Sequence, residues 1–321
     1  MKMAGVFFCG LPERNIIMEI LGLLLGFLCL IKGADFFVDG ASSLARRLGV
    51  PAVLVGLTVA AIGTSLPEAS VSVISALHHS PEIAISNVLG SNLFNTLMVI
   101  GCCALIFPIH VDRELRNRDI PFNVIVSAIL FFLVVCFRQL SRWSGILLLI
   151  LLIAYLVYIC MHTPIDKEED KSNVLSVGRI IVYILGGMIA IVAGGQLVVN
   201  NATGIATALG WSQTLIGVTI VAVGTSLPEL VTSLVACRKG ESGLGLGNAV
   251  GSNIFNILFI LGASSAIAPY GVNMESLIDC LLVLLVALIL FGVSRNSVIS
   301  KKEGLCFVLL YVAYSVFVFL R

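Results

Sequence analysis

A hexapeptide, Gly-Thr-Ser-Leu-Pro-Glu, occurs twice in this chain within long apolar runs, at residues 63–68 and 224–229. The proline in each copy lacks a backbone donor and its ring clashes with the carbonyl group four residues earlier, so an apolar helix should break there. The following residue is Glu68 in one copy and Glu229 in the other. A carboxylate in hydrocarbon is energetically costly and usually marks a functional site, and broken helices at that depth are tolerated where they line a cavity. The sequence therefore predicts two broken membrane helices that form a cation site near the bilayer midplane.

The composition supports an integral membrane protein. Hydrophobic residues make up 59% of the 321 residues and charged residues only 12%, which is too apolar for a soluble domain. A membrane-spanning helix needs about 20 apolar residues. Ten such windows lie between polar breaks, at residues 16–40, 51–78, 82–107, 119–138, 143–161, 176–201, 211–237, 243–268, 275–294 and 301–320. We expect an all-α protein with ten transmembrane helices, of which the second and seventh are broken.

Charge and cysteine content exclude several other classes of protein. The net charge of +1 gives no sign of a nucleic-acid partner. The nine cysteines form no C-x-x-C pair, which argues against a zinc site and a disulfide framework. Residues 1–15 lack a small-residue cleavage pattern, so no removed signal peptide is expected. The expected partners are ions and lipid, and the sequence does not indicate an oligomeric state.

The two copies of the hexapeptide belong to a longer internal repeat. At a constant offset of 161 residues, 25 of the 69 positions between Gly33/Gly194 and Gly101/Gly262 are identical. The repeat includes a second motif, Gly-Ser-Asn-x-Phe-Asn, at residues 90–95 and 251–256. Because each half has five windows, the second copy should enter the membrane from the opposite side. We predict two inverted five-helix repeats, residues 1–161 and 176–321, joined by a polar linker at residues 162–175.

The distribution of positive charge predicts the orientation, because cytoplasmic loops are enriched in Lys and Arg. If the N-terminus is outside, the cytoplasmic loops contain thirteen Lys and Arg residues and the outer loops and termini contain five. Both termini are therefore expected on the outer side of the cell (inner) membrane, with the linker in the cytoplasm.

The motifs supply only oxygen ligands at mid-membrane depth. Glu68 lies 17 residues from one end of its window and 10 from the other, and it shares a helix face with Thr64 if the helix continues. Helix breakage should also leave backbone carbonyl groups unpaired, starting near Ala61. The neighbouring helix carries Ser91 and Asn95 four residues apart. The equivalent candidates in the second half are Glu229, Thr225, Ala222, Ser252 and Asn256.

Hard oxygen ligands of this kind suit Ca²⁺ and Na⁺ and are poor ligands for zinc or copper. Two glutamates carry a charge of −2, which matches one divalent or two monovalent cations. This equality allows the two ions to compete for one site, as exchange requires. A purely structural alternative is that Ser, Thr and Asn side chains hydrogen-bond between helices, and we favour that role for Asn92 and Asn253. Asp35 and Asp39 have uncharged counterparts in the second copy and are expected to face water.

At these motifs the sequence resembles the cation/calcium exchanger superfamily, specifically prokaryotic sodium/calcium exchanger proteins. The paired motifs are similar to the two alpha-repeats of that family. The resemblance implies ten helices in inverted five-helix repeats, sodium entry coupled to calcium extrusion by alternating access, and no cofactor. It implies that the first and sixth helices slide past the remaining core.

The resemblance also implies a role for each candidate residue. Calcium would be bound by Glu68, Glu229 and the backbone at Thr64 and Thr225. Sodium would use Ser65, Ser91 and the Ala61 carbonyl on one side, and Ser226, Ser252 and the Ala222 carbonyl on the other. Asn95 and Asn256 would complete the middle of the site. Some relatives, including potassium-dependent exchangers, have Asp where Asn256 stands, and an amide there argues against potassium coupling.

Three alternatives to sodium/calcium exchange remain at this point. A proton/calcium exchanger is the nearest, because a buried glutamate can carry a proton. A cation channel could use the same oxygen ligands but would need no counter-ion. In an intramembrane hydrolase, Ser65 would be the nucleophile beside Glu68, but the chain has no mid-membrane His or Lys to act as a base. We therefore expect a transporter and not an enzyme.

Overall fold

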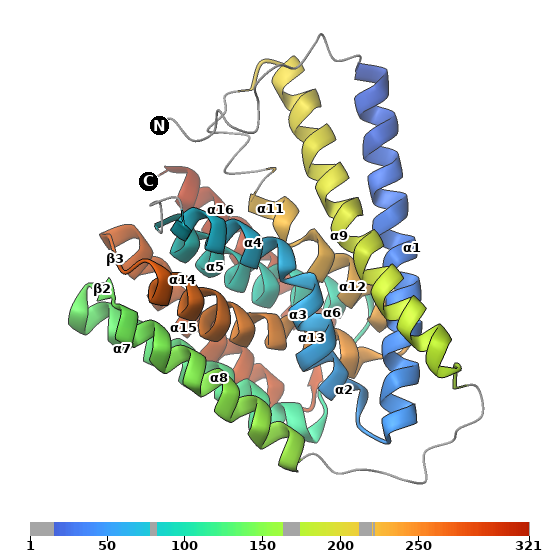
Figure 1. Cartoon of the computed structure of the whole chain (residues 1–321), viewed down its shortest axis with the longest axis horizontal. Helices are drawn as coiled ribbons and strands as arrows, with labels where there is room; N and C mark the ends of the chain where they lie inside the picture. The colour runs from blue at the N-terminus through green and yellow to red at the C-terminus, as the bar shows by residue number, and fades with distance from the viewer. Residues whose placement is uncertain (1–15, 78–81, 163–173, 212–219, 221, 321) are drawn as a thin grey trace.

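The structure is a computed structural model that describes residues 16–77, 82–162, 174–211, 220 and 222–320. Three features considered above lie outside these residues: the N-terminal segment, most of the linker, and the beginning of the seventh predicted window. The described chain is almost entirely helical, and its elements are arranged as Figure 1 shows.

The first half contains five apolar helical stretches at the predicted windows. The α-helices are α1 (Ile16–Leu48), α2 (Ala52–Val55), α3 (Ala61–Thr64), α4 (Leu66–Leu77), α5 (Glu82–Leu93), α6 (Ile100–Ile106), α7 (Ile120–Phe137) and α8 (Arg142–His162). Three π-helical segments join them: η1 (Gly56–Ala60), η2 (Phe94–Val99) and η3 (Leu115–Asp119). The second and third windows are thus composite helices.

The second half repeats this order as far as the structure describes it. Its elements are α9 (Val177–Ala208), α11 (Ala222–Thr225), α12 (Leu227–Arg238), α13 (Ser242–Phe255), η5 (Asn256–Leu261), α14 (Gly262–Ile267), α15 (Met274–Ser294) and α16 (Lys301–Leu320). In the described residues, eight helices are long and apolar enough to cross a membrane, and the bent pair from Ala52 to Leu77 makes nine. The chain is therefore a multi-pass membrane protein.

Helices α1 and α9 are longer than predicted and end at equivalent glycines. Gly49 and Gly210 both have left-handed backbone conformations, with φ of 67° and 80°, which glycine adopts without the steric cost that a Cβ atom imposes. Arg46 and Arg47 occupy the last turn of α1, where positive charge interacts favourably with the helix dipole.

Glycines allow α1 and α9 to pack in backbone contact, and these helices lie side by side in Figure 1. A Cβ atom on Gly187 would lie 2.7 Å from the Gly33 carbonyl oxygen, and one on Gly33 would lie 2.9 Å from the Gly187 carbonyl oxygen. Small residues of this kind bring membrane helices close together. The α1–α9 pair therefore joins the two halves of the chain along most of its length.

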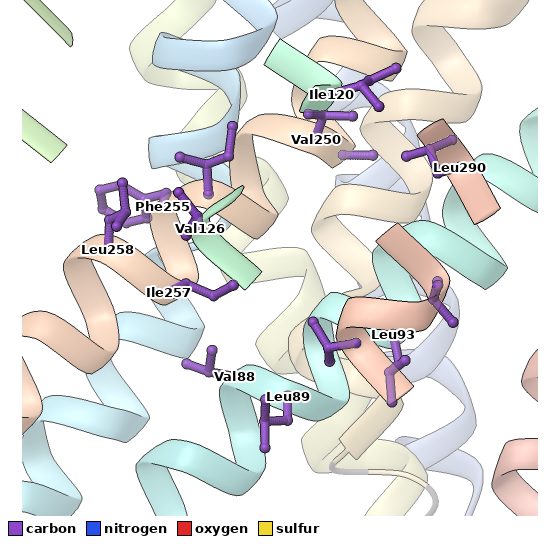
Figure 2. Close-up of a cluster of buried hydrophobic side chains, with 14 of the residues drawn as sticks. Val88, Leu89, Leu93, Ile120, Val126, Val250, Phe255, Ile257, Leu258 and Leu290 are labelled. Carbon is purple, nitrogen blue, oxygen red and sulfur yellow. The ribbon is translucent and has the colours of Figure 1, made fainter. Parts of the chain in front are cut away.

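The remaining helices enclose the main hydrophobic core, part of which Figure 2 shows. Val88, Leu89 and Leu93 of α5 belong to the same buried cluster as Val250 of α13 and Leu290 of α15. Both halves contribute to this core. Consequently neither half can be removed without exposing the buried face of the other.

Two short antiparallel strand pairs connect loops of the two halves. Strand β1 (Ile109–His110) pairs with β4 (Val298–Ile299), and β2 (Gln139–Leu140) pairs with β3 (Tyr270–Gly271). The first pair joins the loop before α7 to the loop before α16. The second joins the loop before α8 to the loop before α15. These pairings fix which loops share a side of the molecule.

Candidate functional site

The hexapeptide breaks its helix in both halves, as the sequence predicts. In the first half α3 ends at Thr64 and α4 begins at Leu66, and the two segments are bent by 49°. In the second half α11 ends at Thr225 and α12 begins at Leu227. The proline is the second residue of α4 and of α12, a position where its missing N–H removes no helical hydrogen bond of the new segment. The glutamate follows in the first turn of each segment.

The expectation of an unpaired carbonyl group at Ala61 is wrong. The amide N–H of Ser65 donates to the Ala61 carbonyl oxygen at 3.1 Å. Pro67 removes only its own donor, and that donor would have bonded to Gly63, so the helical bond to Ala61 is retained. A carbonyl oxygen has two lone pairs, and the Ala61 oxygen therefore keeps one of them for a further partner. Ala222, the repeat equivalent of Ala61, is the first residue of α11.

The two glutamates are fully buried and are held crosswise between the halves. Glu68 and Glu229 both have 0% exposed side chains. Ser226 Oγ donates to Glu68 Oε1 at 3.0 Å, and Ser65 Oγ donates to Glu229 Oε1 at 3.0 Å. The serine of each hexapeptide therefore binds the carboxylate of the other copy. This contact brings the two motifs together, although they are about half the chain apart in sequence.

Several buried polar atoms at these positions have no hydrogen-bond partner among the described residues. They are one oxygen of each carboxylate and atoms of the neighbouring helices, namely Glu68 Oε2, Glu229 Oε2, both side-chain polar atoms of Asn95, Ser252 Oγ and Asn256 Oδ1. Buried polar groups nearly always have partners. Apart from Asn95 Nδ2, which is a donor, these atoms are oxygens, and oxygens left over beside two carboxylates are the arrangement that a bound cation would complete.

The other candidate residues lie in the same part of the molecule with different partners. Ser91 shares a hydrogen bond with Ser226, with 3.2 Å between the hydroxyl oxygens. The Thr64 hydroxyl donates to the Ala60 carbonyl oxygen at 3.0 Å and lies 3.1 Å from Asn248 Oδ1. The Thr64 hydroxyl therefore already has protein partners. Thr225 is partly buried at the end of α11.

The prediction that Asn92 and Asn253 bond between helices is confirmed. Asn92 Nδ2 donates to the Asn253 carbonyl oxygen at 3.2 Å, and Asn253 Nδ2 donates to Thr96 Oγ1 at 2.8 Å. In addition, Asn256 Nδ2 donates to Asn92 Oδ1 at 3.1 Å. These bonds join α5 and η2 to α13 and η5. They also fix the amide plane of Asn256, which turns its oxygen away from Asn92.

Sequence reasoning missed the π-helical segments around the site. Segment η1 ends directly before Ala61, η2 contains Asn95 and η5 begins at Asn256. Single π-turns within α-helices are frequent at functional sites. Segments η2 and η5 fall at nearly equivalent positions of the repeat. Backbone geometry of this kind depends on packing against neighbouring helices and leaves no residue signature.

Glycines beside the second motif allow neighbouring helices to pack closely. A Cβ atom on Gly251 would lie 2.7 Å from the backbone of Leu57, and one on Gly101 would lie 3.1 Å from the Gly304 carbonyl oxygen. Gly262 packs similarly against α8. Nothing among the described residues lies within 4 Å of a Cβ atom on Gly90.

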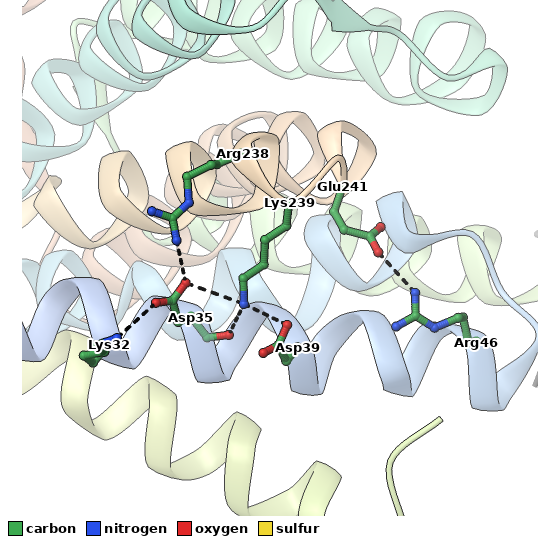
Figure 3. A network of polar contacts seen from close by, with 7 residues as sticks. All are labelled: Lys32, Asp35, Asp39, Arg46, Arg238, Lys239 and Glu241. Atoms are coloured by element: carbon green, nitrogen blue, oxygen red, sulfur yellow. Dashed lines mark hydrogen bonds and ion pairs between the residues drawn. The ribbon is translucent and has the colours of Figure 1, made fainter. Parts of the chain in front are cut away.

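A network of ion pairs lies away from the glutamates, between α1 and the α12–α13 turn (Figure 3). Lys239 Nζ lies 2.7 Å from Asp39 Oδ1 and 3.5 Å from Asp35 Oδ1, and Arg238 lies 3.2 Å from Asp35. The side chain of Asp39 is 52% exposed, whereas that of Asp35 is 21% exposed. Asp39 is therefore exposed and Asp35 is largely covered by its cationic neighbours, and the expectation that both face water stays a prediction.

Comparison with known proteins identifies the family. The profile described as sodium/calcium exchanger protein matches residues 18–161 and 179–320. Inner membrane protein YrbG of Escherichia coli is 37% identical over 258 residues, covering 77% of this chain and 79% of the relative. Sodium/calcium exchanger MaX1 of Methanosarcina acetivorans is 33% identical, covering 95% and 99%. A solved structure of the sodium-calcium exchanger NCX_Mj is 35% identical with a TM-score of 0.84, covering 93% of this chain and 98% of that one. The chain belongs to the sodium/calcium exchanger protein family.

Proposed function

We propose that this protein is a secondary-active antiporter that exchanges sodium for calcium across the cell membrane. The observation that supports the proposal best is the crosswise pair of buried carboxylates, each with one oxygen bonded to a serine of the other half and one oxygen that has no partner in the described part of the chain. Two buried negative charges without a basic partner are unfavourable in a low-dielectric interior. A divalent cation, or two monovalent cations, would neutralise them.

The proposed calcium ligands are the carboxylates of Glu68 and Glu229 and the backbone carbonyl groups at Thr64 and Thr225. The Thr64 hydroxyl already bonds within the protein, which leaves its carbonyl group as the ligand. Calcium takes six to eight oxygen ligands at about 2.3–2.6 Å. Neutral oxygens near the two carboxylates would supply the remaining ligands.

The proposed sodium ligands form two sets on either side of the carboxylates, with the two asparagines between them. They are Ser65, Ser91 and the Ala61 carbonyl group in one set, Ser226, Ser252 and the Ala222 carbonyl group in the other, and Asn95 and Asn256 in the middle. The hydrogen bond between Ser91 and Ser226 supports a shared cavity, because it joins residues of the two sets. Sodium and calcium would thus compete for the same carboxylates and could not be bound together at full occupancy.

We also propose the architecture of ten transmembrane helices in two inverted repeats, residues 1–161 and 176–321, joined by a linker at residues 162–175. The strand pairings support it. With ten spans, the loops joined by β1 and β4 lie on one side of the membrane and the loops joined by β2 and β3 lie on the other. Alternating access would then arise from movement of part of each repeat around the central site.

Transport into proteoliposomes tests the proposed function. Vesicles loaded with sodium and diluted into sodium-free buffer with labelled calcium should accumulate calcium, and dissipating the sodium gradient with an ionophore should stop uptake. Replacing external choline by potassium should not change the rate, because an amide stands at position 256. Calcium uptake that is indifferent to the sodium gradient would contradict sodium/calcium exchange.

The same vesicles distinguish the competing functions. A proton/calcium exchanger would take up calcium under an imposed pH gradient without sodium. A channel would equilibrate calcium with no counter-ion gradient at all. The buried pair of carboxylates favours coupled exchange over a channel. Without a bound cation the two negative charges stay unneutralised in the interior, which disfavours the return of an empty carrier.

A further inference from the structure

Asn87 holds the backbone of Glu68 from the neighbouring helix. Its Nδ2 donates to the Glu68 carbonyl oxygen at 3.3 Å and to Ser72 Oγ at 3.0 Å. Glu68 and Ser72 lie in α4 and are both 0% exposed, while Asn87 lies in α5. The Asn87 amide therefore joins the first turns of α4 to α5. The bonded carbonyl group belongs to Glu68, the residue after the proline at the helix break.

The second half contains the same arrangement. Asn248 Nδ2 donates to the Glu229 carbonyl oxygen at 3.5 Å and to Ser233 Oγ at 3.0 Å. Asn248 and its two partners are the repeat equivalents of Asn87 and its partners, 161 residues further along. Asn248 Oδ1 also lies within hydrogen-bond distance of the Thr64 hydroxyl, at 3.1 Å. A fully buried amide thus connects one glutamate to the helix break of the other half.

The position of each asparagine relative to the proposed ligands gives this contact a function. Asn87 and Ser91 are four residues apart in α5, so they lie on the same face of that helix, and Asn95 follows four residues later in η2. The face of α5 that bonds to the Glu68 backbone is therefore the face that presents Ser91, one turn before η2 presents Asn95. The hydrogen bond fixes the rotation and depth of α4 against this face, and with them the distance from the carboxylate to its neutral co-ligands.

We propose that Asn87 and Asn248 are positioning residues for ion binding. Each holds the glutamate of its own half in register with the serine and asparagine ligands one and two turns further along its helix. Neither asparagine is among the proposed ion ligands, and each acts through its hydrogen bond to the glutamate backbone. The inference rests on the proposed function, because it assigns a role relative to that ion site.

Alanine substitutions test the proposal by separating affinity from folding. In Asn87→Ala and Asn248→Ala, the apparent KM for calcium uptake should rise about five- to tenfold, in keeping with the usual effect of one lost buried hydrogen bond. The maximum rate should change less than KM. The calcium concentration that gives half of the calcium-induced rise in Tm of the purified protein should increase by the same factor.

A matched control removes an asparagine hydrogen bond that lies away from the site. Asn273 Oδ1 accepts from the Ser276 amide at 2.8 Å and caps α15. Asn273→Ala should lower the Tm without calcium but leave both the KM and the calcium dependence of Tm unchanged. If the alanine variants of the site do not fold, Asn87→Leu and Asn248→Leu keep the side-chain size without a donor and should show the same rise in KM.

The outcomes separate this proposal from the proposed function. If the unaltered protein transports calcium against sodium and the folded asparagine variants keep its KM and its calcium dependence of Tm, the positioning role is wrong and the exchange function stands. If the unaltered protein shows no sodium-dependent uptake but calcium raises its Tm, the exchange function fails and the shift in the variants still decides the positioning role. If the unaltered protein shows neither sodium-driven calcium uptake nor a rise in Tm with calcium, both are overturned.

Discussion

The side chains of Glu68 and Glu229 determine the chemistry proposed for this protein. Both are completely buried, and each accepts a hydrogen bond from the serine of the opposite hexapeptide. The crosswise pattern makes the two carboxylates parts of one site, although each belongs to a different half. The chemistry of each residue was predictable from the hexapeptide, because a carboxylate next to a helix-breaking proline in an apolar run has few structural roles.

Replacing either glutamate by glutamine tests this role at the scale of single residues. Glu68→Gln and Glu229→Gln keep the side-chain shape but remove one negative charge, so calcium transport should fall roughly 100-fold or more, which corresponds to about 3 kcal/mol of lost interaction with a divalent cation. Folding should be largely retained, because glutamine can still accept the serine hydrogen bond. The measurement is sodium-driven calcium uptake, with protein amount and Tm determined in parallel.

Glu275 provides the control for this prediction. It lies exposed in the first turn of α15, so Glu275→Gln removes the same charge away from the site. Its transport rate should match that of the unaltered protein. Full transport in Glu68→Gln or Glu229→Gln would exclude the altered carboxylate as an ion ligand.

At the scale of helices, two kinds of irregularity shape the site. The breaks at Ser65 and Ser226 follow from the prolines and were predicted. The π-helical turns η1, η2 and η5 were not, because a π-turn arises where side-chain packing and buried hydrogen bonds reward an extra residue in the turn. Similarly, the expectation that Thr64 and Glu68 share a helix face assumed a continuous helix, whereas a bend of 49° separates them.

The close packing of α1 against α9 gives a prediction that two adjacent residues can test. A Cβ atom on Gly187 would lie 2.7 Å from the Gly33 carbonyl oxygen, so Gly187→Ala must push the helices apart, which should destabilise the protein by about 1–3 kcal/mol. Nothing described lies within 4 Å of a Cβ atom on Gly186. Gly186→Ala should therefore be neutral or stabilise the helix by about 0.5–1 kcal/mol. Thermal unfolding in detergent measures both, and a Tm for Gly187→Ala equal to that of Gly186→Ala would contradict this account of the helix contact.

At the scale of the whole molecule, the two halves differ in charge at two pairs of equivalent positions. Asp35 and Asp39 bind Arg238 and Lys239, whereas their repeat equivalents, Gln196 and Asn200, form a hydrogen bond with each other at 2.9 Å. The Arg46–Glu241 ion pair, at 3.2 Å, lies in the same region. Ion pairs thus tie α1 to the α12–α13 turn at one end of the molecule. This end contains Lys and Arg residues that the charge distribution assigns to the cytoplasm.

The orientation in the membrane is a prediction about the whole chain. A reporter enzyme that is active only outside the cytoplasm should be active when fused after Arg321 and inactive when inserted in the linker at residues 162–175. A fluorescent reporter that folds only in the cytoplasm should show the opposite pattern. Activity of the external reporter in the linker would contradict the orientation that the thirteen and five basic residues predict.

The sequence by itself determined the membrane class, the duplication, the positions of the helix breaks and the oxygen chemistry of the ligands. These features depend on local composition and on residues a few positions apart, which a linear pattern records. Only the tertiary structure decided which serine binds which carboxylate, where the π-turns fall, and which asparagines hold the glutamate backbone. These contacts join helices that are distant in sequence, such as Ser65 with Glu229. Their partners are selected by packing in three dimensions, and no spacing along the chain encodes that choice.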